Sequence, residues 1–183
     1  MSAVDAKKLK AVLKEGGKRA VEIVGVAETG GLEFFCTKLD EPEGELELML
    51  KSLEAMNKPV DPTEEESKGG SGEIGKMIFS INNKQVAIVA YVPKEKVEKI
   101  TAKAWLEETL AKFDGKLVSG EDEVATGLIM ADAEKGIFSL KVRDEAIPTS
   151  IGYLRSKGLF PEQADDSDDS FVMGDDTDFD SFQ

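Results

Sequence analysis

The sequence predicts an α+β fold, in which a mixed β-sheet with an apolar hairpin packs against helices. Two almost continuous apolar segments, "KMIFSIN" and "KQVAIVAYV", lie next to each other and predict a hairpin that is covered on both faces. Segments with helical spacing of apolar residues flank this hairpin on both sides. The charge then changes near residue 160, because the last 23 residues hold nine acids and no base. We therefore expect an N-terminal basic helix, the α+β domain and a disordered acidic C-terminal tail.

The N-terminal segment predicts a basic helix over residues 3–15. Its apolar residues recur at roughly helical spacing between lysines, and Gly16-Gly17 is expected to end it. Residues 20–28 are apolar and β-branched, which is typical of a strand, although a continued helix fits them as well. We therefore predict a division of the chain into a basic helix over 1–19 and a domain over 20–160.

A strand and a helix are predicted next. Residues 31–39 alternate as a half-buried strand does, with Cys36 on the apolar face as a small core residue. Residues 43–57 carry an apolar stripe and begin with acids, which suit a helix dipole. Residues 58–75 contain two prolines, three consecutive glutamates and a Gly-Gly-Ser-Gly run, so they predict a flexible loop.

The hairpin and the helix that follows it have local signals for their ends. Asn82-Asn83 predicts a tight turn, because asparagine tolerates positive φ. Thr101 is a natural N-cap for the amphipathic segment "AKAWLEETLAKFDGK". Trp105, the only tryptophan, lies at the margin of the apolar face and is expected in the core rather than as a base-stacking platform. Gly115 is expected to end this helix.

The remaining part of the domain is predicted to be less regular. Residues 116–127, "KLVSGEDEVATG", are punctuated by glycine and predict a loop. The segments "LIMAD" and "IFSLKV" predict a second hairpin around "AEKG". A short last helix is expected over about 149–157.

The composition argues against an enzyme. The chain has no histidine and a single cysteine, so the usual general base, the commonest metal ligand and any intramolecular disulfide are missing. We expect no catalytic residue, no metal site and no cofactor. The chain has no apolar run of about 18 residues and no secretory signal at its start. These features predict a cytoplasmic protein that does not enter a membrane.

The charge is distributed unevenly. The net charge is −14, but residues 1–160 hold 28 acids and 23 bases, a net of −5. The body can therefore still present a positive face. The tail, 161–183, has too few aliphatic residues to offset its ordering entropy, which predicts disorder. It is either a solubilising tail or a linear motif for a protein partner, with anchors at Phe171, Phe179 and Phe182.

The order of the predicted elements resembles the C-terminal domain of alanyl-tRNA synthetases over about residues 30–127. The residues that match the family pattern are Val92-Pro93, Lys103, Ala104-Trp105, Asp114-Gly115-Lys116 and Ala125-Thr126-Gly127. In that family the domain is a non-catalytic module that helps to bind the tRNA elbow and can take part in dimerisation. The resemblance therefore implies an RNA-binding accessory module, with tRNA or another structured RNA as its partner and a homodimer as a possible state.

The resemblance also implies which residues would bind RNA. Phosphates would be contacted by Lys103, Lys112 and Lys116, with backbone donors from Thr126 and Gly127. The patch would be extended by Lys7, Lys8, Lys10, Lys14, Lys18 and Arg19. The acidic tail would compete with RNA for this patch.

One departure from the family pattern argues against RNA binding. Residues 117–123 carry three acids where the family has consecutive glycines, and acids oppose phosphate. The alternative is therefore a protein-interaction adaptor that reuses the fold, with the acidic tail and its phenylalanines as the partner motif.

Overall fold

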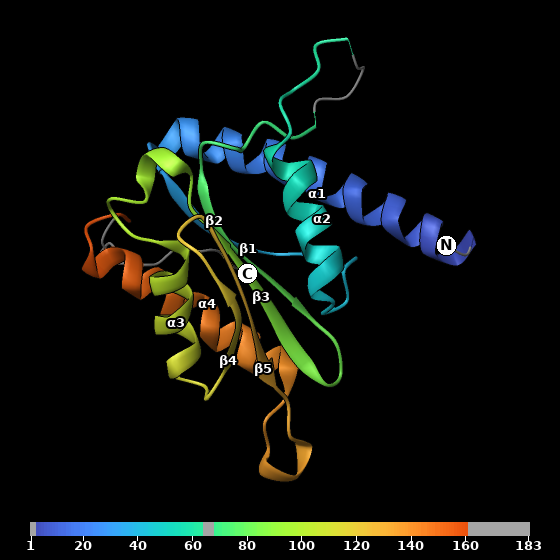
Figure 1. Ribbon diagram of the computed structural model, residues 1–183, viewed down its shortest axis with the longest axis vertical. Helices are drawn as coiled ribbons and strands as arrows, with labels where there is room; N and C mark the ends of the chain where they lie inside the picture. The colour runs from blue at the N-terminus through green and yellow to red at the C-terminus, as the bar shows by residue number, and fades with distance from the viewer. Residues whose placement is uncertain (1–2, 64–67, 161–183) are drawn as a thin grey trace, which may run out of the picture.

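The computed structural model describes residues 3–63 and 68–160 of the 183-residue chain. These residues form one mixed sheet with helices on both faces (Figure 1). The elements in chain order are α1 (Ala3–Gly30), β1 (Phe34–Lys38), α2 (Leu46–Asn57), β2 (Gly75–Ile81), β3 (Gln85–Tyr91), η1 (Lys94–Lys96), α3 (Ala102–Ala111), β4 (Lys116–Gly120), β5 (Val124–Met130), η2 (Ala133–Lys135) and α4 (Ser139–Ser156). The α+β class and the mixed sheet are confirmed.

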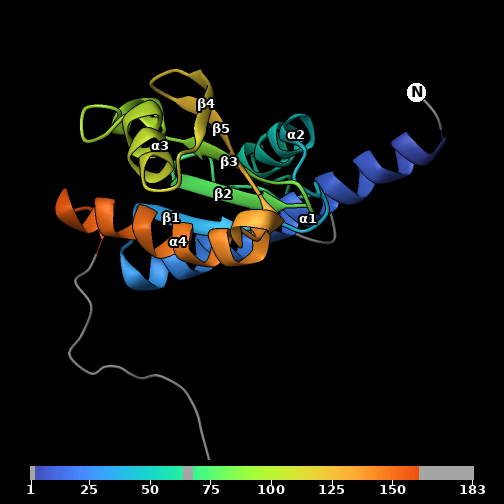
Figure 2. The same ribbon diagram turned by 90° about the horizontal axis from the view of Figure 1, so that it is seen from below.

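The five strands are arranged in the order β1-β2-β3-β5-β4. The first pair, β1 and β2, is parallel, and the other three pairs are antiparallel. Residues of α1 and α2 pack on one face of the sheet and residues of α3 and α4 on the other, and Figure 2 shows the four helices around the strands. Strands β1 and β4 are therefore the edges, and the predicted hairpin β2–β3 lies inside the sheet.

Each face of the sheet has its own core. Alternate residues of β2 point to opposite faces, so that Met77 and Phe79 pack with α3 and α4 whereas Ile78 packs with α1 and α2. Trp105 is fully buried in the first core, as predicted. Its Nε1 donates to the Ser150 carbonyl at 3.1 Å, and its ring meets Phe34 edge to face. Trp105 is therefore not available to stack on a base.

The local signals around the hairpin and α3 gave the correct elements. Thr101 caps α3, since its Oγ1 accepts a hydrogen bond from the Ala104 N–H at 3.1 Å. The turn after β2 is also where it was predicted, but the reason was wrong. Asn82 and Asn83 do not adopt positive φ. The Asn82 Oδ1 instead accepts the N–H groups of Lys84 and Gln85, which closes the turn through the side chain.

The prediction that the first helix ends at Gly16-Gly17 is wrong, because α1 continues to Gly30. Residues 20–28 are helical rather than extended, which confirms the alternative. The physical reason is close helix packing: a Cβ at position 16 would lie 2.8 Å from the Ser52 carbonyl oxygen of α2. The buried Ala20 and Ile23 then stabilise the helix through tertiary contacts.

Residues 116–127 form the edge hairpin β4–β5 rather than the predicted loop. Strand β5 is an interior strand, and Gly127 is required there because a Cβ would lie 2.7 Å from Leu110 Cδ1. The predicted second hairpin is also wrong. It is reduced to a single bridge between Asp132 and Ile137.

The last helix is ten residues longer at its start than predicted, since α4 begins at Ser139 and includes Pro148. The end of α3 differs too. Asp114 has φ +55° and carries the left-handed step, whereas the Gly115 N–H donates to the Leu110 carbonyl at 2.9 Å.

No helix in residues 3–63 and 68–160 is long and apolar enough to cross a membrane. The predicted acidic tail, with Phe171, Phe179 and Phe182, lies outside the described residues.

Candidate nucleic-acid interface

The three lysines that the sequence resemblance selects are exposed but do not meet at one groove. Lys103 lies in the first turn of α3 and Lys112 is its C-cap, nine residues later and about 13 Å along the helix axis. The methylene stem of Lys103 lies against Gly120 at the end of β4, whereas Lys116 begins that strand. Lys112 donates to Thr149 Oγ1 at 3.3 Å. These lysines are therefore spread along the α3–β4 surface.

The same surface carries many acids. The exposed carboxylates on it are Glu107, Glu108, Asp114, Glu121, Asp122 and Glu123. Acids close to a lysine lower the local positive potential and repel phosphate. The α3–β4 surface is thus of mixed charge.

Thr126 and Gly127 are buried in β5, between β3 and β4. Thr126 pairs with Val89 on one side and Ser119 on the other, and its Oγ1 donates to Ser119 Oγ at 3.3 Å. Their place in an interior strand leaves them no accessible backbone donor for RNA. We therefore remove both residues from the candidate interface.

A different part of the molecule gathers positive charge. A groove of about 670 Å³ lies between α1 and α2, where the chain leaves α2. We call it the basic groove, and it is lined by Lys10, Leu13, Lys14, Gly17, Glu54, Ala55, Asn57, Lys58, Pro59 and Lys68. Four of these side chains are lysines. The one acid among them, Glu54, lies 3.4 Å from Lys51 in an ion pair.

The α1 wall of the basic groove is part of a longer stripe. Lys7, Lys10, Lys14 and Lys18 follow one another at three or four residues, so they share one face of the helix and are all exposed. Successive lysines are about 4.5 to 6 Å apart along the axis, which is shorter than the Debye length of about 8 Å at physiological salt. Their potentials therefore add.

The other two cations predicted on this helix are already engaged with protein groups. Lys8 forms an ion pair with Glu43 at 3.1 Å. Arg19 lies 3.8 Å from Glu22 and donates to Thr37 Oγ1 at 3.4 Å. Among the described residues, the basic helix thus has one stripe of exposed lysines without an ion pair and another stripe whose cations are paired with the body.

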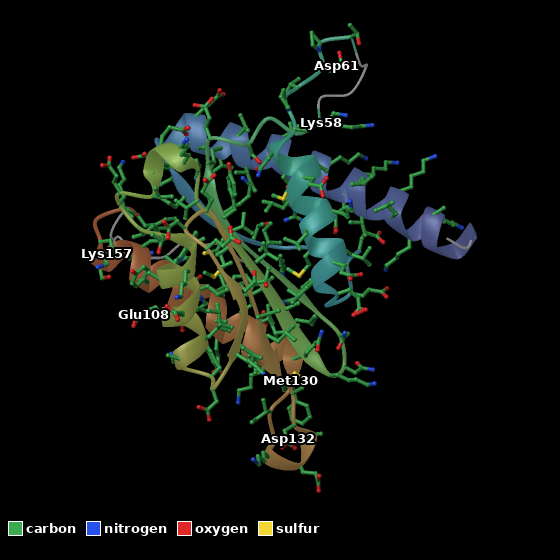
Figure 3. The ribbon with its side chains drawn as sticks, in the orientation of Figure 1. Lys58, Asp61, Glu108, Met130, Asp132 and Lys157 are labelled. Atoms are coloured by element: carbon green, nitrogen blue, oxygen red, sulfur yellow. The ribbon has the colours of Figure 1, made fainter. Side chains whose placement is uncertain are left out.

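The loop that was predicted to be merely flexible holds the remaining two lysines in place. The Gly69 N–H donates to the Gly17 carbonyl at 2.9 Å, and the Gly70 N–H donates to the Lys58 carbonyl at 2.7 Å. Both loop glycines have positive φ, which side chains rarely adopt. The loop therefore returns across α1 and sets Lys68 beside Gly17. Figure 3 shows Lys58 at the base of this loop.

A buried lysine anchors the floor of the basic groove. Lys76 is fully buried, and its Nζ donates to Asn57 Oδ1 at 2.8 Å, the Ser71 carbonyl at 2.7 Å and the Ile74 carbonyl at 2.9 Å. The ammonium also lies 4.5 Å from the Tyr91 ring centroid. Burial lowers the pKa of Lys76 to about 7. Because Asn57 lines the groove, Lys76 fixes the position of a groove residue.

Sequence reasoning found only half of this site. It singled out Lys10 and Lys14 as part of a basic helix, but not Lys58, Lys68 or Lys76. The available signal was the pair of lysines that flank the proline- and glutamate-rich stretch 59–67. Loop closure brings those two ends together.

No protein-family model matches the chain, and no curated protein matches it. Among solved structures, the chain is similar to the C-Ala domain from Aquifex aeolicus alanyl-tRNA synthetase. The two are 17% identical with a TM-score of 0.43, and the alignment covers 70% of this chain and 91% of that one. This is the family that the sequence resemblance indicates.

Proposed function

We propose that the chain is a non-catalytic RNA-binding module that contacts a structured RNA through the basic groove. The observation that carries this proposal is the convergence of four lysines from α1, the end of α2 and the returning loop around one groove. Lysine binds phosphate as a mobile point charge, and several lysines within a Debye length attract a polyanion together. The exposed Leu13 offers an apolar contact for a ribose or a base.

The net charge of the chain does not oppose this proposal. Most of the acidic excess is in residues 161–183, and four exposed lysines of α1 share one stripe. Local potential, rather than net charge, decides whether a phosphate backbone is attracted. The RNA that the sequence resemblance implies is tRNA. A second contact through Lys103, Lys112 and Lys116 stays a prediction.

The test measures binding of fluorescently labelled tRNA by anisotropy at several salt concentrations, starting at about 50 mM. The test variant replaces Lys10, Lys14 and Lys68 by glutamine. Each lost phosphate contact lowers the slope of log K against log salt by about 0.7 to 0.9. We therefore expect the triple variant to lose about 2 to 3 from the slope, together with most of its affinity at low salt.

A matched control distinguishes the effect of losing groove lysines from the effect of a lower net charge on RNA binding. Replacing Lys8, Arg19 and Lys99 by glutamine changes the net charge equally but removes cations that are already paired with acids and do not line the groove. This control is expected to keep the wild-type slope. A third variant with glutamine at Lys103, Lys112 and Lys116 tests the surface that the sequence selected. Equal losses in the groove variant and the paired control, or no tRNA binding by the wild type, would overturn the proposal.

A further inference from the structure

A second groove lies at the other end of the sheet, where β5 leaves it. This groove, of about 730 Å³, is lined by Ile81, Asn82, Asn83, Lys84, Met130, Ala131, Ala133, Ile137, Phe138, Ser139 and Leu140. We call it the apolar groove. Figure 3 shows Met130 and Asp132 at this end of the molecule, far from Lys58.

Large apolar side chains are unusually exposed around the apolar groove. The exposed fractions are 57% for Met130, 36% for Ile137, 55% for Phe138 and 55% for Leu140. Single exposed apolar residues are ordinary, but four that line one groove are typical of a protein- or ligand-binding surface. An aromatic or aliphatic side chain would fill such a groove and remove apolar area from water.

The start of α4 in this groove has polar groups without partners. Phe138 is the N-cap and supplies no side-chain cap, and the first turn of this 18-residue helix carries no acid. The first N–H groups of a helix point outward and, with the helix dipole, favour a carboxylate. In addition, Ser139 lines the groove, is only 7% exposed, and its Oγ has no hydrogen-bond partner among the described residues. A χ1 rotation would turn this hydroxyl toward a ligand.

The charge around the apolar groove also favours an acidic ligand. Lys84 lines the groove, and the exposed Lys135 and Lys141 come from the segments on either side of Phe138. The acids of this segment are Asp132 and the exposed Glu134, fewer than the three lysines. Asp132 is engaged locally, since its Oδ1 accepts the Glu134 N–H at 3.1 Å and its carboxylate lies 4.0 Å from Lys135. The chemistry that fits is therefore a peptide with an aromatic residue among carboxylates.

We propose that the occupant of the apolar groove is the C-terminal segment of the same chain, residues 161–183. A phenylalanine of "DDSF" or "FDSF" would enter between Met130, Phe138 and Leu140, and a neighbouring aspartate would cap α4. The segment holds nine acids and three phenylalanines, which is the composition that the groove selects. This interaction is separate from the proposed RNA contact and does not depend on it.

The length of the chain permits this placement. The described structure ends at Phe160, just beyond the end of α4, and the groove lies at the start of that helix, about 27 Å away. The 11 residues from Phe160 to Phe171 span at most about 36 Å. Phe171 therefore reaches the groove when nearly extended, and Phe179 and Phe182 reach it with slack. A tethered ligand of this kind acts at an effective concentration of about 1 mM.

The experiment is paramagnetic NMR on the full chain. A nitroxide is attached to the variant Ser170→Cys, next to Phe171, in ¹⁵N-labelled protein. The native Cys36 is partly buried and should react far more slowly, because its thiol is hydrogen-bonded to Ser150 Oγ at 2.9 Å and burial raises its pKa to about 12. Wild-type chain treated with the same reagent checks this point.

We expect the label to broaden the amide signals of residues 137–141 and to leave those of Lys10, Lys14 and Lys58 unchanged. At this effective concentration a contact with an intrinsic Kd of about 1 mM is about half formed, so these signals should lose about half or more of their intensity. The disrupting variant is Phe138→Asp in the labelled chain. It removes the apolar wall and supplies α4 with its own N-cap, so it should preserve the fold while abolishing the broadening.

The matched control is Val26→Asp, which places the same charge on another exposed apolar residue (53% exposed) on α1. This variant should keep the broadening. The proposal is overturned if both variants behave alike, if no localised broadening appears, or if the broadened signals are those of the basic groove. A second mixture tests for contact between copies: ¹⁵N-labelled chain without the nitroxide is mixed with ¹⁴N chain that carries it. The same broadening in this mixture also overturns the proposal, because the occupant is then a second copy.

Discussion

The buried Lys76 makes the stability of the protein depend on pH in an unusual direction. Burial lowers the pKa of Lys76 from 10.5 to about 7 in the folded state, whereas an unfolded lysine keeps its ordinary value. Between these two values the unfolded chain binds more protons than the folded chain. The free energy of unfolding must therefore rise as the pH increases from about 7 toward 10.5. Below about pH 7 both states are protonated and the contribution of Lys76 is constant.

The size of this effect follows from the shift. A full difference of one proton changes the free energy of unfolding by about 1.36 kcal/mol for each pH unit. From pH 7.5 to 9.0 the gain is therefore at most about 2 kcal/mol. The real gain is smaller than this limit, because the three oxygens that accept from Nζ favour the charged form.

The assay is urea unfolding followed by Trp105 fluorescence at several pH values and constant ionic strength. The wild type is compared with Lys76→Met, which removes the titrating group and keeps an unbranched side chain one atom shorter. The chain has no histidine, and the contribution of Cys36 is common to both proteins, so the difference between their pH profiles reports Lys76. Lys76→Met is expected to be less stable at pH 7.5, because it leaves three acceptors unpaired, and to lack the rise. Parallel profiles for the two proteins would refute the reasoning.

Two further predictions concern backbone positions, and both are measured by urea unfolding. Gly16→Ala should lower the free energy of unfolding by about 1 to 3 kcal/mol, because its Cβ would press on the Ser52 carbonyl. Gly25→Ala in the same helix meets nothing within 4 Å and should raise the free energy of unfolding by up to about 1 kcal/mol. Equal effects of the two variants would contradict the packing argument. Asp114→Gly should stabilise the chain by about 1 kcal/mol, since Asp114 has φ +55° and glycine adopts this conformation without steric cost; a loss of stability would show that the Asp114 side chain matters more than its backbone.

The parts of the fold that could be predicted from the sequence are those with local causes. The hairpin β2–β3 and the helix after Thr101 are specified by their own periodicity and capping residues. The continuation of α1 through Gly16-Gly17 could not be predicted, because glycine is needed there for the close packing of α2, whose Ser52 carbonyl lies against Gly16. That contact joins two helices that are distant in the sequence. The prediction at Gly127 failed for the same reason. Glycine is typical of a loop, but this glycine lies in an interior strand, where Leu110 packs over it and leaves no room for a Cβ.

The candidate site shows the same limit. Lys10 and Lys14 could be identified because they share a helix with other lysines. Lys58 and Lys68 join them only because Gly69 and Gly70 bind back to α1 and to the end of α2. Charge that converges from distant parts of the sequence depends on the fold, so a count of lysines along the chain does not reveal it.

The two grooves define alternative positions for the same acidic residues. If the tail lay on the basic groove, its carboxylates would compete with RNA, which is the inhibition expected from the charge distribution. If it lies in the apolar groove, its acids are held at the opposite end of the molecule from Lys58, as Figure 3 shows for Met130 and Asp132. Strand β2 runs from Lys76, which holds Asn57 of the basic groove, to Ile81 of the apolar groove, about 17 Å along the strand. This distance exceeds the Debye length of about 8 Å, so salt screens a docked tail from the lysines. A phenylalanine anchor that occupies the apolar groove would therefore keep the basic groove available to phosphate, whereas a tail without such an anchor would be drawn to the lysines by charge alone.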